Sequence, residues 1–169
     1  MIIGHGDIAS VLKDKKKRLF FASGVSNSQE TRESEYTREK NLLRKQDRKS
    51  HLVYFSTLAV FYGKRRYVRL KREMEALIKQ EFPRYALVRL GNITWGTNPH
   101  TLINYFRDQI KKKKPIEIKD TYRYIIDQEE FLHWIDKIPD WSCEMNITGR
   151  RMRIKEIVDE YCYVGLHTK

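Results

Sequence analysis

Two residues four positions apart, Tyr67 and Lys71, form the pair in this sequence best suited to proton transfer. Residues four apart on a helix share one face, so the ammonium should lie near the phenol and lower its pKa by favouring the charged form. A tyrosine with such a neighbour can act as a general acid or base near neutral pH. Thr57 ends the preceding apolar run, and its hydroxyl could bind the same substrate oxygen. Together the three residues could move a proton to or from an alcohol while a nicotinamide exchanges hydride.

A glycine turn near the start of the chain could receive a phosphate. Residues 4–9 read GHGDIA, of the form G-x-G-x-x-A, and follow a short apolar run. Two glycines let the backbone approach a phosphate, and a small third residue lets the next helix pack close to the strand. The N-terminus of that helix offers free N–H groups to the anion. The alternative is a plain glycine turn. We expect the Asp7 carboxylate to point away from a bound pyrophosphate.

Alternating strand-like and helix-like segments would position these residues. After a short strand near residue 2, strands are expected at 18–22, 51–56, 85–90, 115–120 and 144–147. Helices are expected at 29–46, 66–80, 128–138 and 153–161, with another starting near 98. Residues 122–127 should form a loop or short strand, and residues 149–151 a turn. This alternation predicts an α/β fold with a parallel sheet and helices on both faces.

The composition limits the classes of partner. The 169-residue chain is 40% hydrophobic, enough for a packed core, and carries a net charge of +12. Such a charge favours nucleic acid, an acidic membrane face or a phosphate-bearing small molecule. Two cysteines without a C-x-x-C pair, and histidines without metal spacing, indicate neither a disulfide framework nor a metal site. Without a membrane-length apolar run or a signal peptide, we expect a cytoplasmic protein.

Six segments carry a family resemblance through their order along the chain. They are GHGDIA at 4–9, FFASG at 20–24, YFST at 54–57, YVRLKREME at 67–75, LVRLGNITWG at 87–96 and YRYIID at 122–127. In this order they resemble the extended short-chain dehydrogenase/reductases, specifically the NAD-dependent epimerase/dehydratase group that acts on nucleotide sugars. The resemblance implies a truncated Rossmann-like NAD(P)-binding domain over residues 1–169. Residues from 115 onward would form its small substrate-side part.

The resemblance also assigns site residues. Tyr67 and Lys71 follow the Ser-Thr strand and are the catalytic pair, whereas Tyr36 and Lys40 form a second, structural Tyr-x-x-x-Lys pair. The catalytic hydroxyl is Thr57, preferred to Ser56. NAD or NADP would be bound by Gly4, Gly6, Ile8, Ala9, Ala22, Ser23 and Gly24. The nucleotide-sugar substrate would be bound by Asn92 and Arg123.

The chain departs from that family in its first half. Only residues 10–19 separate the glycine turn from the FFASG segment, where the family has two further strand-helix units. The acidic residue expected about 20 positions past the turn has no clear counterpart. Lys15, Lys16 and Lys17 stand nearby, and would either favour a 2′-phosphate or be solvated.

Three functions follow as hypotheses. The first is an NAD(P)-dependent nucleotide-sugar epimerase, dehydratase or reductase, which could form a homodimer through the Tyr67 helix. The second is a non-catalytic binding or assembly subunit that retains the fold. The third, not favoured, is a nucleic-acid-binding protein that uses the basic surface.

Overall fold

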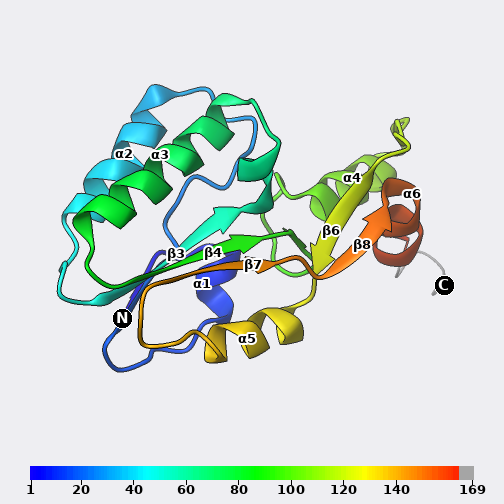
Figure 1. Cartoon of the computed structure of the whole chain (residues 1–169). Helices are drawn as coiled ribbons and strands as arrows, with labels where there is room; N and C mark the ends of the chain where they lie inside the picture. Colours follow the sequence, from blue (N-terminus) through cyan, green and yellow to red (C-terminus); the bar gives the residue numbers. More distant parts are fainter. Residues whose placement is uncertain (164–169) are drawn as a thin grey trace.

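A five-stranded parallel sheet forms the main layer of the protein (Figure 1). The computed structural model describes residues 1–163. In spatial order the strands are β1 (Ile2–Ile3), β2 (Arg18–Phe21), β3 (His51–Thr57), β4 (Tyr85–Leu90) and β7 (Cys143–Ile147). All four neighbouring pairs are parallel, so the predicted α/β, Rossmann-like fold class is confirmed. The predicted domain ends at residue 169, and its residues 164–169 lie outside the described part.

Helices cover both faces of this sheet. On one face lie α1 (Asp7–Val11) and α5 (Gln128–Asp136); on the other lie α2 (Glu33–Arg44) and α3 (Arg66–Glu81). Alternate residues of a strand point to opposite faces, so β3 supplies both cores. Its Val53 and Phe55 pack toward α1 and α5, whereas Leu52 and Tyr54 pack toward α2 and α3.

A smaller unit stands beyond the carboxyl end of the large sheet. Its three strands are β5 (Asn92–Ile93), β6 (Tyr122–Ile126) and β8 (Arg150–Arg153). Helix α4 (Leu102–Lys111), helix α6 (Ile154–Ile157) and a π-helical turn (Val158–Cys162) pack on this sheet. The unit therefore combines segments that lie on both sides of residue 115.

Two expectations about this smaller unit are wrong. Residues 115–120 form no strand, because only Ile116 is even partly buried there and an isolated apolar side chain cannot anchor a ladder. The turn expected at 149–151 stops at Gly149, which has φ +64°. Arg150 instead opens β8, which pairs antiparallel with β6 and buries Met152.

Strand β1 lies at the edge of the sheet, because the chain runs through α1 directly into β2. In a complete dinucleotide-binding sheet, further strands flank the first strand on that side. The connections β1–α1–β2 and β2–α2–β3 step the same way across the sheet but cover opposite faces. The first crossover therefore has the opposite hand to the second, against the strong preference for one hand. Because the chain passes from α1 directly into β2, the described residues supply no strand on the far side of β1.

Candidate functional site

A cleft of about 1650 Å³ opens where the carboxyl ends of the parallel strands meet the smaller unit. Ligands of open α/β sheets bind at this end. Ten of the twelve predicted site residues line the cleft: Gly6, Ile8, Ala22, Ser23, Gly24, Thr57, Tyr67, Lys71, Asn92 and Arg123. The other two, Gly4 and Ala9, do not line the cleft, and Ala9 packs in the core.

The two glycines of the first turn have different structural roles. Gly4 has φ +121°, and a Cβ placed on it would lie 2.4 Å from the Ala22 carbonyl oxygen. Gly4 therefore allows the turn to pack against the end of β2. A Cβ on Gly6 would meet nothing within 4 Å, so Gly6 is the glycine that leaves open space on the cleft side.

Asp7 is turned toward a neighbouring loop, in line with expectation. Its carboxylate accepts hydrogen bonds from the backbone N–H groups of Thr97 (3.0 Å) and Asn98 (3.1 Å). The Trp95 indole N–H donates to the Asp7 carbonyl at 3.0 Å. These contacts tie the start of α1 to the segment that follows β5, and they satisfy the carboxylate.

The hydroxyls at the end of β3 differ in availability. Ser56 is buried, and its Oγ donates to Glu75 at 2.6 Å. Glu75 in turn accepts hydrogen bonds from the Arg89 guanidinium. Thr57 is only half-buried, and its Oγ1 accepts from the Ala59 N–H at 3.2 Å, which leaves its O–H free to donate. This geometry favours Thr57 as the hydroxyl presented to a ligand.

Lys71 is a buried cation with a buried partner. Its Nζ lies 3.0 Å from the Glu39 carboxylate on α2, and it donates to the Tyr54 hydroxyl at 2.9 Å. Gly24 passes directly over this pair, since a Cβ there would lie 2.7 Å from Lys71 Nζ and 2.9 Å from Glu39 Oε1. A glycine is therefore favoured at position 24, because the Lys71–Glu39 ion pair occupies the space that a side chain would need.

Tyr67 lies on the cleft wall one helical turn before Lys71. The Lys71 Nζ is 5.7 Å from the centroid of the Tyr67 ring. Burial raises the pKa of Tyr67 above its ordinary value, and Glu39 and Tyr36 raise it further. The expectation that Lys71 lowers the pKa of Tyr67 is therefore wrong for this arrangement, because burial of the phenol raises its pKa and the nearby Glu39 carboxylate adds to that increase.

Sequence reasoning missed Glu39 and Tyr54. Tyr36, Glu39 and Leu43 are buried on one face of α2, so Glu39 stands in the apolar stripe of that helix. A charged residue within an apolar stripe was the available signal, because such a residue is seldom buried without a partner. Tyr54 gave no comparable signal, since aromatic residues are common in strands.

The second Tyr-x-x-x-Lys pair has structural contacts. The Tyr36 hydroxyl donates to the Glu30 carbonyl, and Arg66 stacks 4.6 Å from the centre of its ring. The Lys40 ammonium pairs with Glu73 of α3 at 2.5 Å. Neither residue lines the cleft, which agrees with the structural role assigned to this pair.

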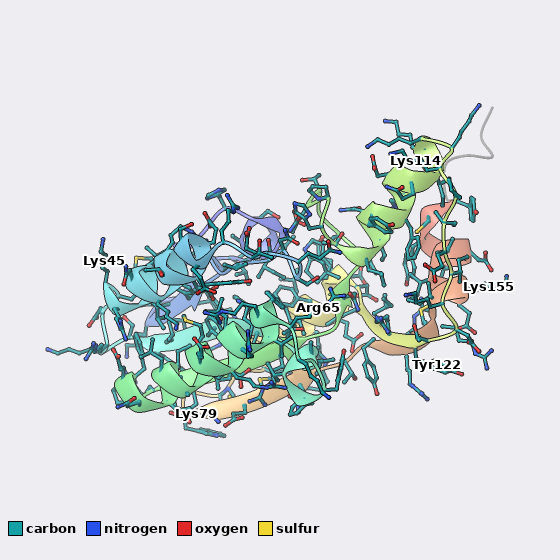
Figure 2. All side chains as sticks on the ribbon, turned by 90° about the horizontal axis from the view of Figure 1, so that it is seen from above. Lys45, Arg65, Lys79, Lys114, Tyr122 and Lys155 are labelled. Carbon is teal, nitrogen blue, oxygen red and sulfur yellow. The ribbon has the colours of Figure 1, made fainter. Side chains whose placement is uncertain are left out.

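Positive charge predominates around the cleft. Its lining contains six lysines and arginines against two carboxylates. Among residues 1–163, three of these cations take part in no ion pair: Lys64, Arg65 and Arg123. Figure 2 shows Arg65 near the junction of the two units, whereas the labelled lysines lie toward the outer ends. The free charge at the cleft suits an anionic ligand.

Other predicted features have clear positions. The Asn92 side chain donates to the Tyr124 carbonyl at 3.1 Å, which links β5 to β6. Lys15–Lys17 precede β2, at the end of the sheet opposite the cleft, so they cannot reach a 2′-phosphate bound in it. Across residues 1–163, no three His, Cys, Asp or Glu side chains are grouped to hold a metal. None of the helices there has the length and apolar character for a membrane span.

Comparisons with known proteins find similarity in structure alone. No protein-family profile and no curated protein matches the sequence. Among solved structures, the Bordetella bronchiseptica enzyme WbmG in complex with NAD and UDP has a TM-score of 0.67 at 20% identity. That match covers 88% of this chain and 56% of WbmG.

Two other matching structures are a dehydratase and an epimerase. One is the dTDP-glucose 4,6-dehydratase of Bacillus anthracis in complex with NAD, with a TM-score of 0.63 at 15% identity. That match covers 84% of this chain and 56% of the dehydratase. The other is the UDP-glucose 4-epimerase of Thermotoga maritima with UDP-glucose, with a TM-score of 0.66 at 13% identity. That match covers 90% of this chain and 62% of the epimerase.

The chain therefore spans less than two thirds of the length of these structures. With β1 at the edge of its sheet, it has the Rossmann-like fold of the NAD-dependent nucleotide-sugar epimerases and dehydratases in a shortened form.

Proposed function

We propose that this protein binds a nicotinamide cofactor and a nucleotide sugar in the cleft and acts as an epimerase, dehydratase or reductase. One observation carries the proposal: the cleft brings Thr57, Tyr67 and Lys71 together with the glycine turn at the carboxyl ends of parallel strands. The comparison structures with NAD and UDP support it through their fold. NAD is favoured over NADP, because Lys15–Lys17 lie at the far end of the sheet.

The residues present fit one half of such a cofactor. Gly6 and the N-terminus of α1 leave room for its diphosphate, and the Ala22–Gly24 loop would flank its nicotinamide riboside. The adenosine half would extend past β1, where the described chain supplies no further strand. We therefore expect weaker binding than in a complete sheet. When bound, the nicotinamide supplies the hydride acceptor or donor.

The remaining chemistry falls to side chains of the chain. Thr57 would orient a substrate hydroxyl, and Tyr67 would hold or transfer the proton at that oxygen. Lys64, Arg65 and Arg123 would attract the substrate diphosphate, since they carry free charge at the cleft. A reducing, cytoplasmic location fits the two free cysteines. Dimerisation through α3 stays a prediction.

A second candidate is a non-catalytic subunit that binds a nucleotide in the same cleft. The buried Glu39–Lys71 pair favours it, because Lys71 is already neutralised. The shortened first half of the sheet favours it as well. The nucleic-acid hypothesis gains no support from the labelled lysines, since Lys45 and Lys79 lie toward one end of the molecule and Lys114 and Lys155 toward the other (Figure 2).

Calorimetric titration with NAD, followed by UDP, tests the proposal. Saturable NAD binding supports cofactor use, and a change in nicotinamide absorbance on adding UDP-glucose or another UDP-sugar would show hydride transfer. Tyr67→Phe should retain NAD binding and lose hydride transfer. Tyr36→Phe is the matched control, and should retain both. Absence of NAD binding at millimolar cofactor would refute the enzyme, and binding of UDP alone would favour the second candidate.

A further inference from the structure

Glu39 is a fully buried carboxylate whose oxygens all have partners within the protein. Its Oε2 accepts from the Val25 N–H at 2.7 Å, and its Oε1 accepts from the Tyr54 hydroxyl at 2.6 Å. The Lys71 Nζ approaches the same Oε1 at 3.0 Å. Burial by itself would raise the pKa of Glu39, but Lys71, Tyr54 and Val25 outweigh burial and lower it. Glu39 is therefore an ionised group built into the wall behind the cleft.

Lys71 depends on this carboxylate. Only 3% of its side chain is exposed, and its ammonium donates to Glu39 and Tyr54. Within residues 1–163 no hydrogen bond joins Lys71 to Tyr67, although Nζ lies 5.7 Å from the Tyr67 ring centroid. The ammonium thus turns its hydrogens toward α2 and β3, away from the phenol that shares its helix.

We propose that Glu39 is the resident counter-ion of Lys71: it positions the ammonium, cancels its charge at Tyr67, and keeps Tyr67 a protonated hydrogen-bond donor in the ligand-free cleft. The inference rests on the proposed function only in taking Tyr67 and Lys71 as the reactive pair. Glu39 is a positioning residue, since it acts on the cleft through Lys71. A ligand that draws Lys71 away from Glu39 would expose the ammonium to Tyr67 and make the phenol more acidic.

Most of the other charged groups near Tyr67 are paired on the protein surface, whereas Arg65 takes part in no ion pair within residues 1–163. Arg66 pairs with Glu33 and Glu73, and Glu30 pairs with Arg32. The titratable groups that face Tyr67 from the elements packed around it are Lys71, Arg65 and Arg66 of α3 and its N-cap, Glu39 and Tyr36 of α2, Tyr54 of β3 and Glu30 of the preceding loop. Glu39 and Lys71 are the two fully buried charges among them.

The test is an NMR titration of the ligand-free protein labelled with 13C at the tyrosine Cζ position. The Tyr67 signal is assigned by its loss in Tyr67→Phe. In Glu39→Gln the charge of Lys71 is no longer cancelled, and the pKa of Tyr67 should fall by about 1–3, the usual effect of an opposite charge at this range. In Lys71→Met it should rise. In the double variant both charges are gone, and the pKa should return close to the wild-type value.

Two controls separate this role from simple packing. Tyr54→Phe removes a hydrogen bond from the same cluster without changing its charge, so it should leave the pKa of Tyr67 unchanged. An unchanged pKa in Glu39→Gln, or equal shifts in Glu39→Gln and Tyr54→Phe, would overturn the proposal. If Glu39→Gln does not fold, the double variant decides: its Tyr67 pKa should stay close to the wild-type value because the two charges cancel, and a clearly different pKa refutes the cancellation.

This titration needs neither cofactor nor substrate. A protein that shows the expected shifts but binds no NAD would retain the Glu39 inference and lose the proposed enzyme function. NAD binding with no shift would give the reverse result, so the two failures are distinguishable.

Discussion

Replacing each glycine of the first turn with alanine separates a folding role from a binding role. Gly6 is the N-cap of α1, with φ −79° and ψ −174°, a conformation open to alanine. Its new methyl group would point into open space on the cleft side. Gly4 has φ +121°, and its methyl group would overlap the Ala22 carbonyl at 2.4 Å. We expect Gly6→Ala to impair binding and Gly4→Ala to impair folding.

The magnitudes follow from these local geometries. In Gly6→Ala the unfolded chain loses freedom, which stabilises the fold by about 0.4–1 kcal/mol. Alanine is a poorer N-cap than glycine, at a cost of up to about 1 kcal/mol. The two terms nearly cancel. In Gly4→Ala the positive φ alone costs about 1–3 kcal/mol, and displacement of the backbone at the end of β2 adds to that.

Urea unfolding and NAD calorimetry measure the two effects on the same samples. Gly6→Ala should unfold within about 1 kcal/mol of the wild type and bind NAD at least about ten-fold more weakly, or 1.4 kcal/mol. Gly4→Ala should lose more than about 2 kcal/mol of stability. A folded Gly6→Ala protein that binds NAD as well as the wild type would show that the turn does not hold the diphosphate.

Three further predictions concern stability. Lys71→Met leaves the Glu39 carboxylate buried and unpaired, so the free energy of unfolding in urea should fall by about 3–5 kcal/mol; adding Glu39→Gln should recover much of it, and a double variant no more stable than Lys71→Met would contradict this. The pKa of Glu39 is lowered in the folded protein from 4.5, so its contribution is present above pH 4.5 and is lost as the pH falls below it. As the pH is lowered, the urea midpoint of Glu39→Gln should therefore fall less steeply than that of the wild type, and parallel plots of midpoint against pH for the two proteins would be evidence against an ionised Glu39. Met74→Ala empties a fully buried site and should cost about 2–5 kcal/mol, whereas the exposed Ile118→Ala should stay within about 0.5 kcal/mol; similar values for both would contradict the packing around α3.

The order of the main elements could be predicted because it is encoded locally. Continuous apolar runs mark β3 and β4, which are buried on both faces of a parallel sheet. The spacing of Leu70, Met74 and Ile78 marks one face of α3. Such patterns depend on neighbours within a few positions, so they can be recognised without knowledge of the fold. They also predict where the cleft lies, since the carboxyl ends of parallel strands share one edge of the sheet.

The smaller unit was harder to predict because its pattern depends on distant partners. Strand β8 carries three arginines in four residues and has only Met152 to bury. Its strand conformation comes from pairing with β6, more than twenty residues earlier in the chain. Residues 115–120 show the converse: their sequence alternates in the manner of a strand, but the fold offers them no partner.

The sequence by itself was enough to predict that Tyr67 and Lys71, and not Tyr36 and Lys40, line the cleft, because order along the chain distinguishes the two pairs. Only the tertiary structure decided the electrostatic state of that pair. Glu39 lies on another helix, 32 residues before Lys71 in the chain, and the two charges meet because α2 and α3 pack side by side on one face of the sheet (Figure 1). Helical spacing brings an ammonium near a phenol, whereas the strength of its effect depends on every buried charge around it, and those charges come from elements that only folding brings together.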